Sequence, residues 1–155
     1  MLGSVSTFRI AALLVAMLAT TSGLRDHVFA AEQASISTVA GTGERGYSGD
    51  GGLASRAQVN NPYGVVIGPD NALYFCDTDN HVVRRVTRDG KISTIAGNGK
   101  RGYSGDGKKA TDASLNEPYE VRLDPQGNLY VVERMNHVVR HVDSRTGLIR
   151  TVAGN

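Results

Sequence analysis

The chain repeats itself at a fixed offset of 56 residues over most of its length. Residues 37–41 (Ser-Thr-Val-Ala-Gly) return as residues 93–97 (Ser-Thr-Ile-Ala-Gly). The run Asn-His-Val-Val-Arg at 80–84 returns unchanged at 136–140, and a third copy begins at Thr151. A fixed period of this kind indicates one structural unit that has been copied, with neighbouring copies burying each other's apolar faces.

Within each copy, short runs of β-branched and aromatic residues alternate with turn residues. In the first copy these runs predict strands at residues 36–40, 63–67, 72–76, 82–87 and 91–96. The second copy repeats this order. Between copies lies a Gly-rich connection that can form one helical turn at most.

Four short strands joined by tight turns predict an antiparallel meander, and meanders arranged radially form a β-propeller. We therefore expect an all-β fold with one propeller blade at about 62–97 and a second at about 118–154. The strand expected at 36–40 would precede them as a leading strand, because it matches the fourth strand of a blade.

The repeated pattern resembles the NHL repeat, a propeller blade named for its Asn-His-Leu signature. Residues 80–82 and 136–138 match that signature with Val in place of Leu. The resemblance covers residues 36–155 and implies a propeller fold. Known roles in this family range from protein and RNA binding to sensor domains of receptor kinases, with relatives among lyases and lactonases, so the resemblance specifies function only weakly.

The number of blades departs from a complete propeller. A propeller closes with about four blades or more, whereas this chain carries two blades and the leading strand, which makes an incomplete propeller. Three interpretations stay open. The chain is a fragment of a longer propeller, or it assembles as a homo-oligomer (for instance three copies giving six blades), or it persists as a marginal monomer.

The N-terminal residues differ from the rest in kind. Residues 10–19 are an unbroken apolar run, shorter than the roughly 20 residues that span a bilayer. Together with the small residues near Ala30, this run predicts a signal peptide at residues 1–30, followed by a short lead at 31–35. The predicted localisation is secreted or periplasmic, with no membrane span after cleavage; an uncleaved anchor is the alternative.

Charge and cysteine content narrow the classes of function. The net charge is +2 and no basic face with interleaved aromatic residues is evident, so we expect no nucleic-acid partner. Cys76 is the only cysteine and aligns with Val132, which predicts an inert core thiol.

The loops on one end of the blades form the candidate ligand-binding face. In an up-and-down blade, the loop between the second and third strands emerges on the same end as the connection between blades, and loops on a rigid scaffold often carry function. The expected face comprises Tyr47, Asp50, Asp77, Asp79, His81, Tyr103, Asp106, Glu133 and His137. An oxygen site for calcium near Asp50 and Asp106 is the weaker alternative to a loop that bonds its own backbone.

The role of the two histidines in the repeated signature separates two functional hypotheses. His81 and His137 occupy equivalent positions and are candidate ligands for zinc or another divalent metal, although a residue that recurs once per blade usually makes a structural hydrogen bond. His141 aligns with Arg85 and is expected to be exposed on a strand. The sequence favours a non-enzymatic binding or scaffold module without a cofactor or catalytic residues. The alternative is a lactonase- or lyase-like enzyme with a divalent metal at the channel mouth.

Overall fold

The computed structural model describes residues 34–154. The predicted signal peptide lies outside these residues. Every element discussed below falls within the unit Ile36–Asn155. No helix among the described residues has the length and hydropathy needed to cross a membrane.

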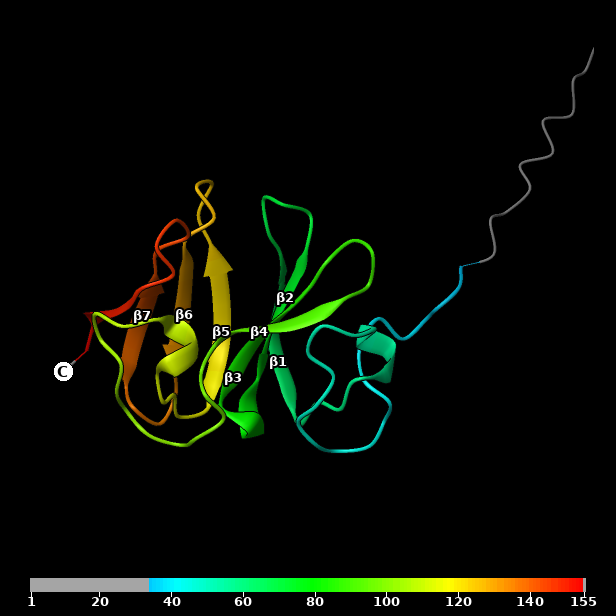
Figure 1. The fold of residues 1–155 in the computed structure, drawn as a ribbon, viewed down its shortest axis with the longest axis horizontal. Coiled ribbons are helices and arrows are strands. Elements are labelled where there is room, and N and C mark those ends of the chain that lie inside the picture. The colour runs from blue at the N-terminus through cyan, green and yellow to red at the C-terminus, as the bar shows by residue number, and fades with distance from the viewer. Residues whose placement is uncertain (1–33, 155) are drawn as a thin grey trace, which may run out of the picture. The chain divides into compact units, whose positions relative to one another are not determined.

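The described chain folds into two four-stranded antiparallel sheets, which we call blade 1 and blade 2 (Figure 1). Blade 1 consists of β1 (Pro62–Ile67), β2 (Leu73–Asp77), β3 (Val82–Val86) and β4 (Ile92–Ala96). Blade 2 consists of β5 (Pro118–Leu123), β6 (Leu129–Glu133), β7 (Val138–Val142) and β8 (Ile149–Ala153). Each sheet is ordered as its strands occur in sequence, so the predicted all-β meander and incomplete propeller are confirmed.

Within residues 34–154, three short 3-10 helices interrupt the loops. They are η1 (Ala54–Arg56), η2 (Thr78–Asn80) and η3 (Ala110–Asp112). The first and third occupy equivalent places in the two Gly-rich connections, where the sequence allowed no more than one helical turn. The second follows β2 and is itself followed by His81, whose φ of 57° reverses the chain into β3.

The Gly-rich connection covers the outer edge of the blade that follows it. The N–H of Ile92 donates to the carbonyl of Gly52 at 3.0 Å, and the N–H of Gly51 donates back to Ile92 at 2.8 Å. In blade 2 the N–H of Ile149 donates to Lys108 at 2.9 Å. Since an unpaired edge strand can template pairing with another chain, this cover protects the outer strands β4 and β8.

The predicted leading strand at 36–40 is wrong, because these residues form no strand in the structure. A strand needs a partner, and β4 obtains its partner from β3 in the same blade. Residues 36–40 pair with no described strand, although Ala40 packs against the buried cluster that contains Phe75. The segment keeps one contact of its counterpart: the N–H of Gly41 donates to Ala54, as the N–H of Gly97 donates to Ala110, both at 2.9 Å.

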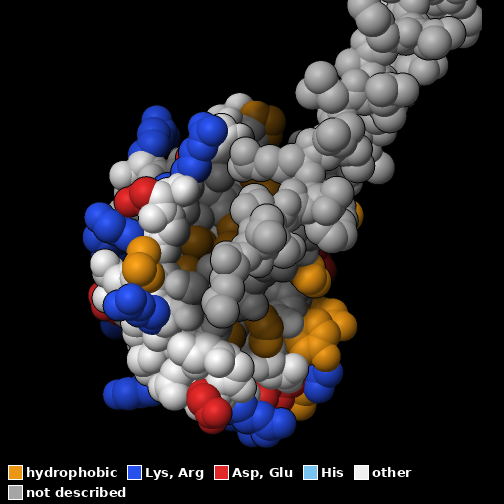
Figure 2. Space-filling view, turned by 90° about the vertical axis from the view of Figure 1, so that its right-hand side faces the viewer, with side chains coloured by type: hydrophobic (Ala, Val, Ile, Leu, Met, Phe, Trp, Pro, Cys, Tyr) orange, Lys and Arg blue, Asp and Glu red, His pale blue; other side chains and the backbone are white. Residues whose placement is uncertain are grey.

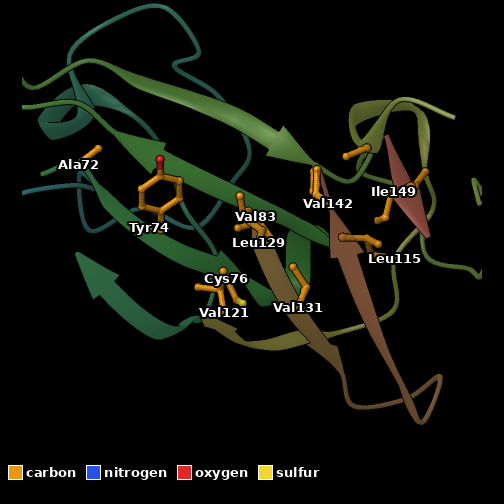
Figure 3. Packing of buried hydrophobic residues seen from close by; sticks show 13 residues of the cluster. Ala72, Tyr74, Cys76, Val83, Leu115, Val121, Leu129, Val131, Val142 and Ile149 are labelled. Carbon is orange, nitrogen blue, oxygen red and sulfur yellow. The ribbon is translucent and has the colours of Figure 1, made fainter. Parts of the chain in front are cut away.

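The main core lies between the two blades. It joins apolar side chains of blade 1, including Cys76 and Val83, to side chains of blade 2, including Val121 and Val131 (Figure 3). A smaller cluster lies beneath η1 and contains Phe75 and Ile92 among its members. The blades therefore stabilise each other, as the repeat predicted.

Candidate functional site

A buried arginine organises the predicted face in blade 1. The Nη1 of Arg84 donates to Oδ2 of Asp77 at 3.0 Å, and its Nη2 donates to Oδ1 of Asp50 at 2.8 Å. The same Nη2 donates to the carbonyl of Ser48 at 3.0 Å. The ring of Tyr47 covers the guanidinium, with the Cζ atom 5.1 Å from the ring centroid. We call this group the blade 1 arginine cluster; it ties the Gly-rich connection to β2 and β3.

Asp77 is held by further donors at the end of β2. Its Oδ1 accepts the backbone N–H of Asn60 at 2.7 Å and Nδ2 of Asn80 at 2.9 Å. Asn80 also donates to the carbonyl of Gly46 at 2.7 Å. Burial raises the pKa of Asp77, while these hydrogen bonds and Arg84 act to lower it. The asparagine of the repeated signature therefore joins three segments of one blade.

Blade 2 reproduces this cluster around Arg140. Its Nη1 donates to Oε1 of Glu133 at 2.7 Å, and its Nη2 donates to Oδ1 of Asp106 at 2.6 Å and to the carbonyl of Ser104 at 3.0 Å. The ring of Tyr103 covers the guanidinium at 5.2 Å. Arg84 and Arg140 are both completely buried. We call this second group the blade 2 arginine cluster.

The change from Asp77 to Glu133 leaves the arrangement intact. Oε2 of Glu133 accepts the N–H of Asn116 at 2.8 Å and Nδ2 of Asn136 at 2.6 Å, and Asn136 also donates to Gly102 at 2.8 Å. Each donor to Asp77 thus has an equivalent donor to Glu133. The longer carboxylate performs the same structural task.

The outer carboxylates bind the fourth strand of their blade. Oδ2 of Asp50 accepts the N–H of Thr94 at 3.1 Å, and Oδ2 of Asp106 accepts the N–H of Thr151 at 2.9 Å. Burial acts to raise the pKa of Asp106, but the hydrogen bond from Thr151 and the guanidinium of Arg140 outweigh it and lower this pKa. The hydroxyl groups of Tyr47 and Tyr103 also contact these threonines, at 2.9 and 2.8 Å.

The two candidate metal ligands differ in their surroundings. Nδ1 of His81 accepts the N–H of Glu117 at 3.3 Å, so this histidine joins blade 1 to the entry of blade 2. Burial lowers the pKa of His81, and the charge of Arg101 lowers it further. His137 is exposed and lines a shallow hollow with Val132, Val139 and Gly154.

The remaining candidates stand apart from the arginine clusters. Asp79 is exposed and accepts Nδ2 of Asn61 at 3.2 Å. Cys76 is fully buried, and burial raises the pKa of its thiol to about 12, in keeping with an inert core thiol. The expectation that His141 is exposed is wrong: it is buried, with Tyr130 packed edge-on at 5.0 Å between ring centroids.

The structure brings together the predicted loops of each blade, but the carboxylates on these loops form ion pairs with a buried arginine. In residues 34–154, no group of three or more His, Cys, Asp or Glu side chains is placed to hold a metal ion. Sequence reasoning missed Arg84 and Arg140, which hold the predicted residues in place. The available signal was that both arginines recur at the 56-residue offset together with Asp50 and Asp106.

Comparison with known proteins supports the architecture. The chain is 32% identical over 125 residues to Protein SUPPRESSOR OF QUENCHING 1, chloroplastic, from Arabidopsis thaliana, covering 77% of this chain and 12% of that protein. It is 33% identical over 79 residues to NHL repeat-containing protein 2 of Homo sapiens, covering 50% of this chain and 11% of that protein. The chain thus spans only about an eighth of the length of either relative.

Among solved structures, an auxiliary nutrient binding protein from Bacteroides thetaiotaomicron superposes with a TM-score of 0.55 at 26% identity. The match covers 73% of this chain and 28% of that one. No family model matches the sequence. With its repeated Asn-His signature and its two propeller-type sheets, the chain is a partial homologue of the NHL repeat-containing proteins.

Proposed function

We propose that this chain is an exported NHL-repeat module that binds or scaffolds other molecules and does not itself catalyse a reaction. The observation that carries this proposal is that the carboxylates predicted as candidate ligands form ion pairs with buried arginines. Asp77 and Glu133 each neutralise a completely buried guanidinium. Recruiting either one as a metal ligand or general base would leave that guanidinium without its buried partner, which is costly.

The ligand-binding role falls to the exposed members of the same end. Tyr47, Asp79, Tyr103 and His137 are exposed on loops that the arginine clusters fix in place. A rigid loop surface on a propeller scaffold suits recognition of a protein or small ligand. The nutrient-binding description of the structural relative from Bacteroides thetaiotaomicron is compatible with such a role.

Export is part of the proposal and rests on the sequence. The apolar run at residues 10–19 and the small residues near Ala30 support cleavage by a signal peptidase, with release into the periplasm or outside the cell. The chain should be produced with its own N-terminus in a bacterial host and recovered from the periplasm or the medium. Mass spectrometry of that material should place the mature N-terminus at Ala31 or Glu32.

The enzymatic alternative is tested on the same preparation. We expect metal analysis to find neither zinc nor calcium in stoichiometric amounts, and a panel of lactone substrates to show no turnover above buffer. The matched variant is His137→Ala, which removes an exposed imidazole. Stoichiometric metal together with turnover that His137→Ala abolishes would establish the alternative enzyme and overturn the binding role.

A further inference from the structure

The junction between the two blades is tied at its loop end by two side chains of blade 1. Oγ1 of Thr78 donates to the carbonyl of Pro118 at 2.7 Å, and this hydrogen bond is buried. Nδ1 of His81 accepts the N–H of Glu117 at 3.3 Å. Because this chain itself supplies both blades, the groups at this junction are held in place without any further blade.

The hydrogen bond from Glu117 determines which nitrogen of His81 carries the proton. Since Nδ1 accepts, Nε2 carries the hydrogen in the neutral imidazole. Nε2 has no hydrogen-bond partner in the described part of the chain, and it is not one of the buried polar atoms that lack a partner there. Neutral His81 therefore presents an unused N–H donor to solvent at the loop end of the junction.

The connection between the blades brings Arg101 beside this donor. It leaves β4 at Gly97, where an added Cβ would lie 2.3 Å from the carbonyl oxygen of His81. Arg101 then forms a parallel β-bridge with Leu115, which lies two residues before Glu117. The chain thus holds Arg101 between two segments that touch His81. In keeping with this placement, burial lowers the pKa of His81 and the charge of Arg101 lowers it further.

The charges at this place differ from those at the equivalent place in blade 1. Lys100 and Arg134 stand where blade 1 has Glu44 and Thr78. Basic residues as such do not mark a site, since Figure 2 shows Lys and Arg side chains spread around the rim of the molecule. What distinguishes the junction is that blade 2 has exchanged a carboxylate and a hydroxyl for two cations next to an unused donor.

Two carboxylates oppose this positive charge, those of Glu117 and Asp79. Glu117 is neutralised by Arg134 at 3.1 Å, whereas Asp79 has no cationic partner between residues 34 and 154. Lys100 and Arg101 are exposed and likewise form no ion pair within that range. The two unpaired cations outnumber the single unpaired carboxylate, so the junction carries an excess of positive charge.

We propose that Nε2–H of His81 and the guanidinium of Arg101 form a binding site for an oxyanion, the carboxylate or phosphate group of a ligand. A guanidinium and a fixed N–H donor are the groups that recognise such oxygens through charge-assisted hydrogen bonds. Lys100 adds attraction at longer range. The site joins one residue of the predicted ligand-binding face, His81, to Arg101, which the sequence did not single out. It deepens the binding role proposed above and rests on it.

The test is a titration of the exported protein at pH 8 with inorganic phosphate and, separately, with acetate, in a buffer that contains neither. NMR follows the ring signal of His81, which is identified by its absence in His81→Ala. We expect a saturable shift with a Kd of about 1–10 mM for the preferred anion. Tighter binding of phosphate assigns the site to a phosphate group, and tighter binding of acetate assigns it to a carboxylate.

The decisive variant is Arg101→Gln. The Arg101 side chain makes no hydrogen bond or ion pair to the described residues, so the variant should fold normally, and it should weaken anion binding about tenfold or more. The matched control is Arg45→Gln, which removes the equivalent exposed arginine from blade 1 and should leave the Kd unchanged. A shift that survives Arg101→Gln, or no saturable shift with either anion, overturns the proposal.

Failure of this site and failure of the proposed function give different results. Without anion binding, the loops that carry Tyr47 and His137 keep the binding role, because they are separate from the junction. Stoichiometric metal with turnover that His137→Ala abolishes would remove the binding role, whatever the anion titration gives.

Discussion

The two blades share a sequence pattern but bury opposite faces. Val121 is fully buried, whereas its equivalent Val65 is 63% exposed. Cys76 is fully buried, whereas its equivalent Val132 is 39% exposed. Within each blade, by contrast, the arginine clusters make equivalent hydrogen bonds, with Glu133 in the place of Asp77. Contacts made inside a repeat follow from its own sequence, whereas contacts made between repeats follow from which neighbour is present.

The largest expected effect tests the arginine clusters, which should contribute equally to the stability of the two blades. Arg84→Met and Arg140→Met each leave a buried carboxylate without its guanidinium, so each should lower the free energy of unfolding by about 3–5 kcal/mol. Urea denaturation at one fixed chain concentration measures this. The matched control is Arg85→Met, which breaks a partly exposed pair with Asp70 and should cost about 1 kcal/mol or less. A large difference between the two buried arginines would show that the clusters are not equivalent.

A smaller effect should appear at only one blade. Gly64→Ala forces a side chain into a left-handed backbone against the carbonyl of Tyr119, so it should cost about 2 kcal/mol by strain and local displacement. Glu120→Ala, at the equivalent place in blade 2, removes a partly exposed side chain and its surface ion pair with Arg122, and should cost about 0.5 kcal/mol or less. Thermal unfolding of both variants compares them. Equal losses would mean that the seam at β1 and β5 is not as close as the structure shows.

The smallest effect concerns the two histidines. Alanine removes the imidazole and leaves no side-chain acceptor. Because both histidines adopt the left-handed backbone, His81→Ala and His137→Ala carry the same backbone cost, and the difference between them isolates the side chain. His81→Ala also removes the acceptor for the N–H of Glu117, so it should cost about 1 kcal/mol more than His137→Ala at pH 8. Urea denaturation of the two variants measures this difference.

The same pair has a defined pH dependence. Burial and Arg101 lower the pKa of His81, against the opposing charges of Glu117 and Asp79. The unfolded chain therefore takes up a proton first as pH falls. The stabilisation by neutral His81 is complete above the unfolded value near 6.5 and is lost as pH drops through the lower folded value. The difference in stability between wild type and His81→Ala should shrink over that window; a difference that grows on acidification would contradict this role.

Much of the fold was predictable from local signals. The strands at β1 to β4 begin and end within about a residue of the predicted runs, because Gly, Pro-Asp-Asn and Asp-Gly turns interrupt β-branched segments at short intervals. The strand expected at 36–40 failed for a nonlocal reason: its sequence suits a strand, but no described neighbour is there to pair with it. The prediction that His141 is exposed was wrong for a similar reason, because aligning the two copies gave no sign that Tyr130 packs against it.

The candidate site was predictable in place but not in chemistry. Loop alternation in a meander correctly brought residues near Asp50 to residues near Asp77, since both leave the sheet at one end. Nothing local showed that Arg84 would enter the space between them, because an arginine on a strand is usually exposed. The sequence therefore predicts these carboxylates as candidate metal or ligand contacts, whereas in the structure they form ion pairs with arginine.

The sequence by itself determined the repeated unit, its strand order and its turns, since these depend on hydrogen bonds and backbone preferences within a few residues. Tertiary structure alone decided which face of each blade is buried and which charges are neutralised. Burial depends on the surface that arrives from elsewhere in the chain, and two blades built from the same repeat therefore expose equivalent residues on opposite sides.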